Sequence, residues 1–82
     1  MFARGRMPVV NWRNHIESLP AVLRGKPCIK GTRVPVALIL GFLAARRTVA
    51  QVVDKFPVIT EADIAASLDY ARELAEFEAI PA

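Results

Sequence analysis

The densest group of chemically informative residues is GKPCIKGTRVPV, residues 25–36, which contains two glycines, two prolines, three cations and the only cysteine of the chain. A phosphate-binding loop of the Walker type needs two glycines five positions apart, followed by Lys and then Ser or Thr. Here Gly25 and Gly31 are six positions apart, and Thr32 follows Gly31 with no lysine between them. The segment therefore lacks the spacing of a nucleotide-hydrolysing loop.

The other reactive side chains do not form a catalytic set. Nearby lysines favour a reactive thiolate at Cys28, but a free cysteine is more often a small buried residue, and we favour that interpretation. Because His15 is the only histidine, a multi-histidine metal site and a Cys–His pair are both unfavoured. One helical face carries three acids, interpreted as a solvated surface: Asp69, Glu73 and Glu76. We predict no enzyme activity, no catalytic residue, no cofactor and no metal.

With no catalytic set in the sequence, the function that its charge distribution favours is binding of an anionic partner. Residues 1–50 carry nine Lys or Arg against one acid, giving +8, whereas residues 51–82 carry two against seven acids, giving −5; together they make the net charge of +3. This asymmetry predicts a basic end that meets nucleic acid or an acidic protein. The alternative is that these cations only solvate the surface. The candidate binding residues are Arg4, Arg6, Arg13, Arg24, Lys26, Lys30, Arg33, Arg46 and Arg47.

The length allows one domain with a small core. A chain of 82 residues buries roughly 60% of its unfolded surface, so a partner subunit would add stability. The longest apolar run, residues 34–45, is shorter than the roughly 20 residues of a membrane-spanning helix. No signal-peptide pattern is present, and a single cysteine cannot form an internal disulfide. We therefore expect a cytoplasmic protein that does not associate with membranes.

The elements expected along the chain are a mobile basic arm at 1–12, a single small domain at 13–78 and a tail at 79–82. Within the domain we predict a short β-hairpin at about 14–34 and helices at about 35–46, 48–56 and 60–77. Pro35 is well placed at a first helical position. Thr48 with Gln51 forms a capping-box pattern, and Thr60 repeats it with the shorter Asp63. The fold class is mainly α, a hairpin followed by a three-helix core that resembles a helix-turn-helix.

The apolar patterns predict how these helices pack. The first helix is apolar on every side, so we expect it to be buried all round, by the domain or by a partner. Two further stripes are expected to face the core: Val49, Val52, Val53 and Phe56 in the second helix, and Ile64, Leu68, Ala71 and Ala75 in the third. The third helix would be the recognition helix of a helix-turn-helix, but its acids would repel DNA. Any DNA contact is therefore expected from the arm, the hairpin and the end of the first helix.

The order of elements from residue 15 to residue 75 resembles the family known as domain of unknown function 433, DUF433. The most specific matches lie in GKPCIKGTRVPV: Gly25, Lys26, Pro27, Ile29, Gly31, Thr32, Arg33 and Val36. Supporting matches precede and follow it: Ile16, Glu17, Ser18, Pro20, Phe56, Pro57, Thr60, Asp63, Ile64, Ala66, Leu68 and Tyr70. The resemblance implies a homeodomain-like or winged-helix-like core of three helices preceded by a β-hairpin.

The resemblance also implies a function and partners. These short prokaryotic proteins are similar to VapB-like antitoxins of type II toxin–antitoxin pairs, which implies a PIN-like ribonuclease toxin encoded nearby. A homodimer, formed through the hairpins or the first helix, and binding of operator DNA are further expectations. The alternatives are a stand-alone DNA-binding transcriptional regulator and a structural dimerisation module that binds no nucleic acid.

The chain departs from the family pattern at two arginines. Arg24 and Arg46 stand where the family usually has glycine, so the hairpin turn and the end of the first helix are expected to differ in shape. In the second helix, Ala50 and Gln51 replace residues that are commonly acidic, which makes its exposed face less negative.

Overall fold

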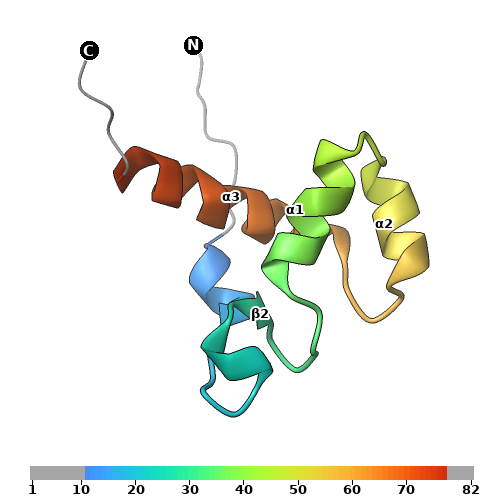
Figure 1. The fold of residues 1–82 in the computed structure, drawn as a ribbon. Coiled ribbons are helices and arrows are strands. Elements are labelled where there is room, and N and C mark those ends of the chain that lie inside the picture. Colours follow the sequence, from blue (N-terminus) through green and yellow to red (C-terminus); the bar gives the residue numbers. More distant parts are fainter. Residues whose placement is uncertain (1–10, 78–82) are drawn as a thin grey trace.

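The computed structural model describes residues 11–77, which form a short β-hairpin region followed by three helices. Figure 1 shows the hairpin region at one end of α1 and the turn into α2 at its other end, while α3 crosses the middle of the molecule. The mainly α fold with an N-terminal hairpin is as predicted. No helix in the described part of the chain combines the length and apolar character needed to cross a membrane.

The hairpin pairs β1 (Ile16–Glu17) with β2 (Cys28–Ile29) in antiparallel register, Ile16 opposite Ile29 and Glu17 opposite Cys28. Two short 3₁₀ helices belong to the same region: η1 (Trp12–Asn14) precedes β1, and η2 (Leu23–Gly25) lies in the loop between the strands. A two-stranded pair is marginal by itself in water. It is stabilised here because Ile16 and Ile29 are buried against the helices.

Helix α1 (Val36–Ala44) ends in a Schellman motif, in which the N–H of Arg47 donates to Phe42 O and the N–H of Arg46 donates to Leu43 O. Arg46 has the left-handed φ of 70° that this motif normally gives to glycine. The expectation that this helix ends differently is therefore wrong. The arginine adopts the strained conformation instead of changing the cap.

Helices α2 (Val49–Lys55) and α3 (Glu61–Phe77) begin as the sequence predicts. Thr48 Oγ1 accepts from the N–H of Gln51, and the Gln51 side chain accepts from the N–H of Thr48. Thr60 and Asp63 form the same reciprocal pair at 3.2 and 2.9 Å. Both capping boxes satisfy N–H groups that a helix start otherwise leaves unpaired.

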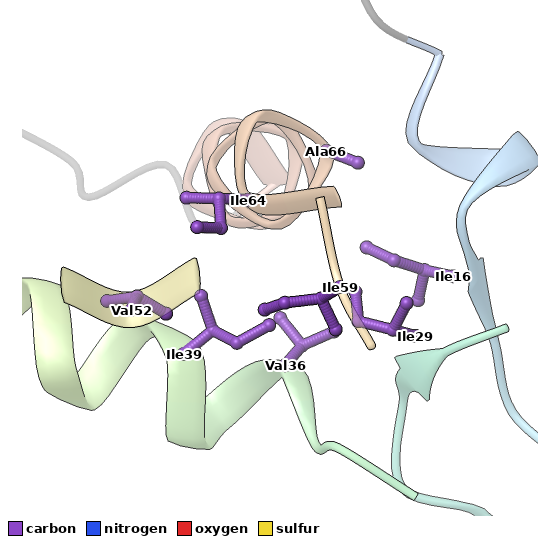
Figure 2. Close-up of a cluster of buried hydrophobic side chains, with 8 residues drawn as sticks. All are labelled: Ile16, Ile29, Val36, Ile39, Val52, Ile59, Ile64 and Ala66. Atoms are coloured by element: carbon purple, nitrogen blue, oxygen red, sulfur yellow. The ribbon is translucent and has the colours of Figure 1, made fainter. Parts of the chain in front are cut away.

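The core combines side chains from every layer of the fold. Figure 2 shows Val36 and Ile39 of α1, Val52 of α2 and Ile64 of α3 converging, with Ile16 and Ile29 completing the cluster on the hairpin side. Ile59, which lies between α2 and α3, is only 2% exposed. These contacts make the hairpin and the helices one packed unit.

Several predicted core positions are wrong. Val49 and Leu68 are exposed, at 37% and 48%, and Ala75 is exposed as well. Helix α3 instead buries Ala66 and Ser67, and turns Tyr70 toward Trp12 of η1 at 4.8 Å between ring centroids. Packing against η1 selects a different face of α3 from the one that the apolar stripe indicates. Trp12, assigned to the arm from the sequence, thereby contacts α3.

The domain alone does not bury α1 all round, and the alternative prediction, burial by a partner, stays a prediction. Only Val36 and Ile39 are buried in this helix. The opposite side faces solvent and is formed by Ala37, Leu38, Gly41, Ala44 and Ala45.

Candidate functional site

The loop between the strands, with the residues that follow β2, carries four exposed cations, Arg24, Lys26, Lys30 and Arg33, which we call the hairpin cations. None of them takes part in an ion pair with another residue of the described part of the chain. A cation without a protein partner keeps its full charge available to a phosphate or a carboxylate.

The backbone around the hairpin cations is held in an unusual conformation. Leu23, Arg24 and Gly25 have positive φ values of 51°, 56° and 82° in succession. A non-glycine residue in this region costs roughly 1–2 kcal/mol. Arg24 is exposed in this strained turn, and the N–H of Lys26 closes η2 by donating to Leu23 O at 3.1 Å.

The segment after β2 is held by its own polar atoms. Gly31, at φ 75°, donates its N–H to Glu17 Oε2 at 3.3 Å. The Thr32 hydroxyl donates to Ile29 O at 2.8 Å and accepts from the N–H of Val34 at 3.0 Å. Cys28 is fully buried, which fits the interpretation of this residue as a packing side chain. GKPCIKGTRVPV therefore builds a strand, a turn and the approach to α1 while leaving its cations outside.

A shallow open groove lies beside this segment. It combines apolar and polar walls: Glu17, Val22, Gly31, Thr32, Arg33, Val34 and Val58. Val58, which comes from the connection before α3, is 68% exposed. The groove thus places an apolar contact surface next to Arg33.

Arg46 and Arg47 form a separate basic site at the other end of α1. Both are exposed, and Arg47 borders a small hollow with Phe42, Gln51, Val52 and Lys55. Nine helical residues, a length of about 13 Å at 1.5 Å per residue, separate this turn from the hairpin end (Figure 1). The predicted binding residues therefore do not form one patch.

The remaining predicted cations differ in availability. Arg13 Nη2 lies 3.4 Å from Glu73 Oε1, and its guanidinium stacks 4.3 Å from the centre of the Trp12 ring. This arginine is therefore engaged with η1 and α3, although its side chain is 62% exposed. Arg4 and Arg6 lie outside the described residues.

The side of α3 that faces away from the core, the α3 outer face, is formed by Glu61, Ala62, Ala65, Leu68, Arg72, Ala75 and Glu76. Its only cation is held by neighbouring acids. Arg72 Nε donates to Asp69 Oδ1 at 3.0 Å, and Nη1 donates to Glu76 Oε2 at 2.8 Å. The hydrogen bond with Asp69, with the charge of Glu76, raises the pKa of Arg72 above its ordinary value. This face presents acids around an apolar centre and offers no free cation.

One polar contact that sequence patterns did not indicate joins the hairpin region to α3. His15 Nδ1 lies 2.8 Å from Asp63 Oδ1, while the other oxygen of Asp63 accepts from the N–H of Thr60. The two residues are 48 positions apart, and no local spacing signals such a pair. We interpret His15 as a structural residue that is occupied by this contact.

The described residues contain no group of three or more His, Cys, Asp or Glu side chains arranged to hold a metal ion. The features that remain are surfaces: the hairpin cations with their groove, the turn after α1, and the α3 outer face. These surfaces expose charged and apolar side chains to solvent.

Comparison with known proteins adds one finding. A family model described as "Protein of unknown function (DUF433)" matches residues 16–71, which are 56 of the 82 residues. No curated protein and no solved structure matches the chain. The matched region begins at β1 and ends within α3, so it includes the hairpin cations and most of the α3 outer face.

Proposed function

The chain belongs to the DUF433 family, and from that premise we propose that it is the antitoxin of a type II toxin–antitoxin pair that binds and neutralises a PIN-like ribonuclease. The family description assigns no function, so the proposal rests on the resemblance to VapB-like antitoxins and on the surfaces of this chain.

The observation that carries the proposal is the composition of the α3 outer face. In a helix-turn-helix protein the second helix of the motif enters the major groove and needs side chains that approach phosphates and base edges. Here the equivalent helix exposes Leu68 at 48% between acids, and its only cation, Arg72, is held by Asp69 and Glu76. Such a face would repel DNA, whereas exposed leucine with a polar surround is suited to a protein partner.

The hairpin cations give the proposed partner its second contact. A metal-dependent ribonuclease concentrates carboxylates at its catalytic cleft in order to hold divalent cations. The four hairpin cations, which form no ion pair within residues 11–77, complement such a cleft in charge and would obstruct RNA binding there, and Arg33 does so at the edge of a partly apolar groove. In this mechanism α3 anchors the toxin and the hairpin blocks its active site.

The test is co-expression with the neighbouring small ribonuclease-like gene product. Growth arrest by the neighbour should be relieved by this chain, and Leu68→Glu should reduce rescue and weaken co-purification of the two proteins at least tenfold. Leu74→Glu is the matched control, because Leu74 has the same 48% exposure on α3 but is not on the outer face. A neighbour that is equally harmless with and without this chain would refute the proposal. Equal loss from both variants would refute the role of the outer face.

A second candidate function, operator binding as a transcriptional regulator, is favoured by the hairpin cations alone. They would follow a phosphate backbone without needing α3, so the same chain could bind DNA and a toxin through different surfaces. Absence of any mobility shift with the upstream DNA at about 50 mM salt, where such contacts are strongest, would exclude this function for the isolated chain.

A further inference from the structure

The small hollow at the turn between α1 and α2 has a lining that contains positive charge and no acid (Figure 1). Phe42 of α1, Arg47 of the turn, and Gln51, Val52 and Lys55 of α2 form its walls. Val52 is only 1% exposed, whereas the arginine, the glutamine and the lysine are all exposed. The hollow therefore combines apolar walls with a polar, positively charged rim.

Local contacts hold the polar side chains of this hollow in place. Gln51 Oε1 accepts from the N–H of Thr48 at 2.9 Å, so the amide nitrogen Nε2 is the end that remains to donate, and it donates to no residue within 11–77. The N–H of Arg47 donates to Phe42 O at 3.0 Å, which fixes the backbone of this arginine. Lys55 Nζ lies 5.6 Å from the centre of the Phe42 ring. Lys55 and Gln51 are four residues apart and share one face of α2.

None of these donors is neutralised by an acid in the described part of the chain. Arg47 and Lys55 form no ion pair with a residue within 11–77. Asp54 is the acid of α2, and it is not part of the lining. The groove beside the hairpin differs in this respect, because its lining contains Glu17 as well as Arg33. A lining of donors without an acceptor carboxylate is suited to an anion.

From these observations we propose that the hollow binds a terminal phosphate group, carried by free phosphate or by a small phosphate monoester. Such a group has a charge of about −1.5 to −2 and three strong acceptor oxygens. Arg47 supplies a forked pair of donors, Lys55 a point charge and Gln51 an amide donor. A carboxylate or a phosphodiester of a nucleic-acid backbone carries a single charge, so either would leave one of the two cations without a counter-charge.

The apolar walls strengthen this recognition, while the open rim limits it. Phe42 and the buried Val52 exclude water from one side of the bound ion, and hydrogen bonds to a charged group are stronger where the local dielectric constant is lower. Because the rim remains in contact with solvent, we expect saturable but weak binding, with a dissociation constant on the order of 1 mM. The inference goes beyond the antitoxin function and does not depend on it.

An NMR titration of the isotope-labelled full chain at constant ionic strength tests the site. The probes are inorganic phosphate and adenosine 5′-monophosphate, with sodium chloride in the reference samples. At least one probe should shift the backbone amide signals of residues 47–55 in a saturable manner. Tighter binding of inorganic phosphate would identify the free ion as the ligand, and tighter binding of the nucleotide would identify the monoester. Absence of saturable shifts for both probes, well above the expected dissociation constant, would refute the proposal.

Three variants separate the site from a general effect of charge. Gln51→Glu should raise the dissociation constant at least tenfold, because a carboxylate replaces the amide donor, while glutamate still accepts from the N–H of Thr48 and keeps the capping box. Lys55→Gln should raise it at least threefold. Arg46→Gln is the matched control and should leave it unaltered, because it removes the same charge from an exposed position that does not line the hollow.

Two outcomes with these variants would overturn the proposal. The first is equal weakening by Lys55→Gln and Arg46→Gln, or no weakening by Gln51→Glu. The second is loss of operator-DNA binding in Lys55→Gln when neither small probe binds the wild-type chain, which would assign the hollow to a nucleic-acid backbone. Toxin neutralisation is measured separately, so either idea can fail without the other.

Discussion

Around the hairpin, Arg24, Lys26, Lys30 and Arg33 extend into solvent without an ion pair in the described part of the chain, whereas the cations that lie against α3 are bound to its acids. Arg13 meets Glu73, and Arg72 meets both Asp69 and Glu76. Both regions are rich in charge, but only the hairpin offers positive charge to a partner. Availability, rather than the number of cations, therefore separates the proposed anion-binding end from the proposed protein-binding face.

The two regions also differ in how they are stabilised. Helix α3 has 17 residues and its own hydrogen-bond ladder, while each hairpin strand has only two residues. The hairpin cations consequently depend on Ile16 and Ile29, which anchor their backbone in the core. A surface with little local structure is positioned here by a small number of buried contacts.

The largest expected effect comes from removing one of those anchors. Ile29→Ala should lower the free energy of unfolding by about 2–5 kcal/mol, because it leaves a cavity where a 2% exposed side chain was. Urea unfolding followed by circular dichroism measures this loss. Val58→Ala, at a 68% exposed position, is the control and should change stability by less than about 0.5 kcal/mol. A loss below about 1 kcal/mol for Ile29→Ala would mean that the hairpin is not anchored as the structure indicates.

Features that depend on long-range packing could not be predicted from the sequence, whereas features set by neighbouring residues could. Both capping boxes and the three helices follow from local patterns, since Thr48 with Gln51 and Thr60 with Asp63 are only three residues apart. The buried face of α3 could not be predicted in the same way. Trp12 packs on Tyr70 and His15 bonds to Asp63, so the approach of η1 decides that Leu68 faces solvent.

The candidate site was likewise predictable only in part. The basic half of the chain was evident from composition, but composition gives neither pairing nor position. Arg13 and Arg33 look equivalent in the sequence, yet only Arg13 is bound to an acid of α3. Arg46 and Arg47 are separated from the hairpin by the length of α1, which only the fold reveals.

A smaller effect is expected on the salt dependence of DNA binding, when an exposed hairpin cation or the acid-bound Arg72 is replaced by alanine. Lys30→Ala and Arg33→Ala should each reduce the slope of log affinity against log salt for operator DNA by about 0.9, the contribution of one phosphate contact. Arg72→Ala should leave that slope unchanged, because its guanidinium is already bound by Asp69 and Glu76. Fluorescence anisotropy between 50 and 200 mM salt, a range over which four phosphate contacts should lower the affinity by roughly 10²-fold, provides the measurement. Equal slopes for Arg33→Ala and Arg72→Ala would remove the distinction between the two regions.

The smallest effect concerns the strained arginines, one in the hairpin loop and one at the end of α1. Arg24 and Arg46 have φ values of 56° and 70°, so replacement by glycine should relieve strain and raise stability by about 0.5–1 kcal/mol in each case. Thermal unfolding measures the gain. For Arg24→Gly we also expect weaker binding to DNA or toxin, because one exposed positive charge of the hairpin loop is lost.

Arg24→Lys separates strain from charge at this position, because it keeps the positive charge and the strained backbone. It should bind like the wild-type chain and show no gain in stability. If Arg24→Gly binds as tightly as the wild-type chain, neither the charge nor the strained backbone of Arg24 contributes to binding. The proposed binding site then consists of Lys26, Lys30 and Arg33.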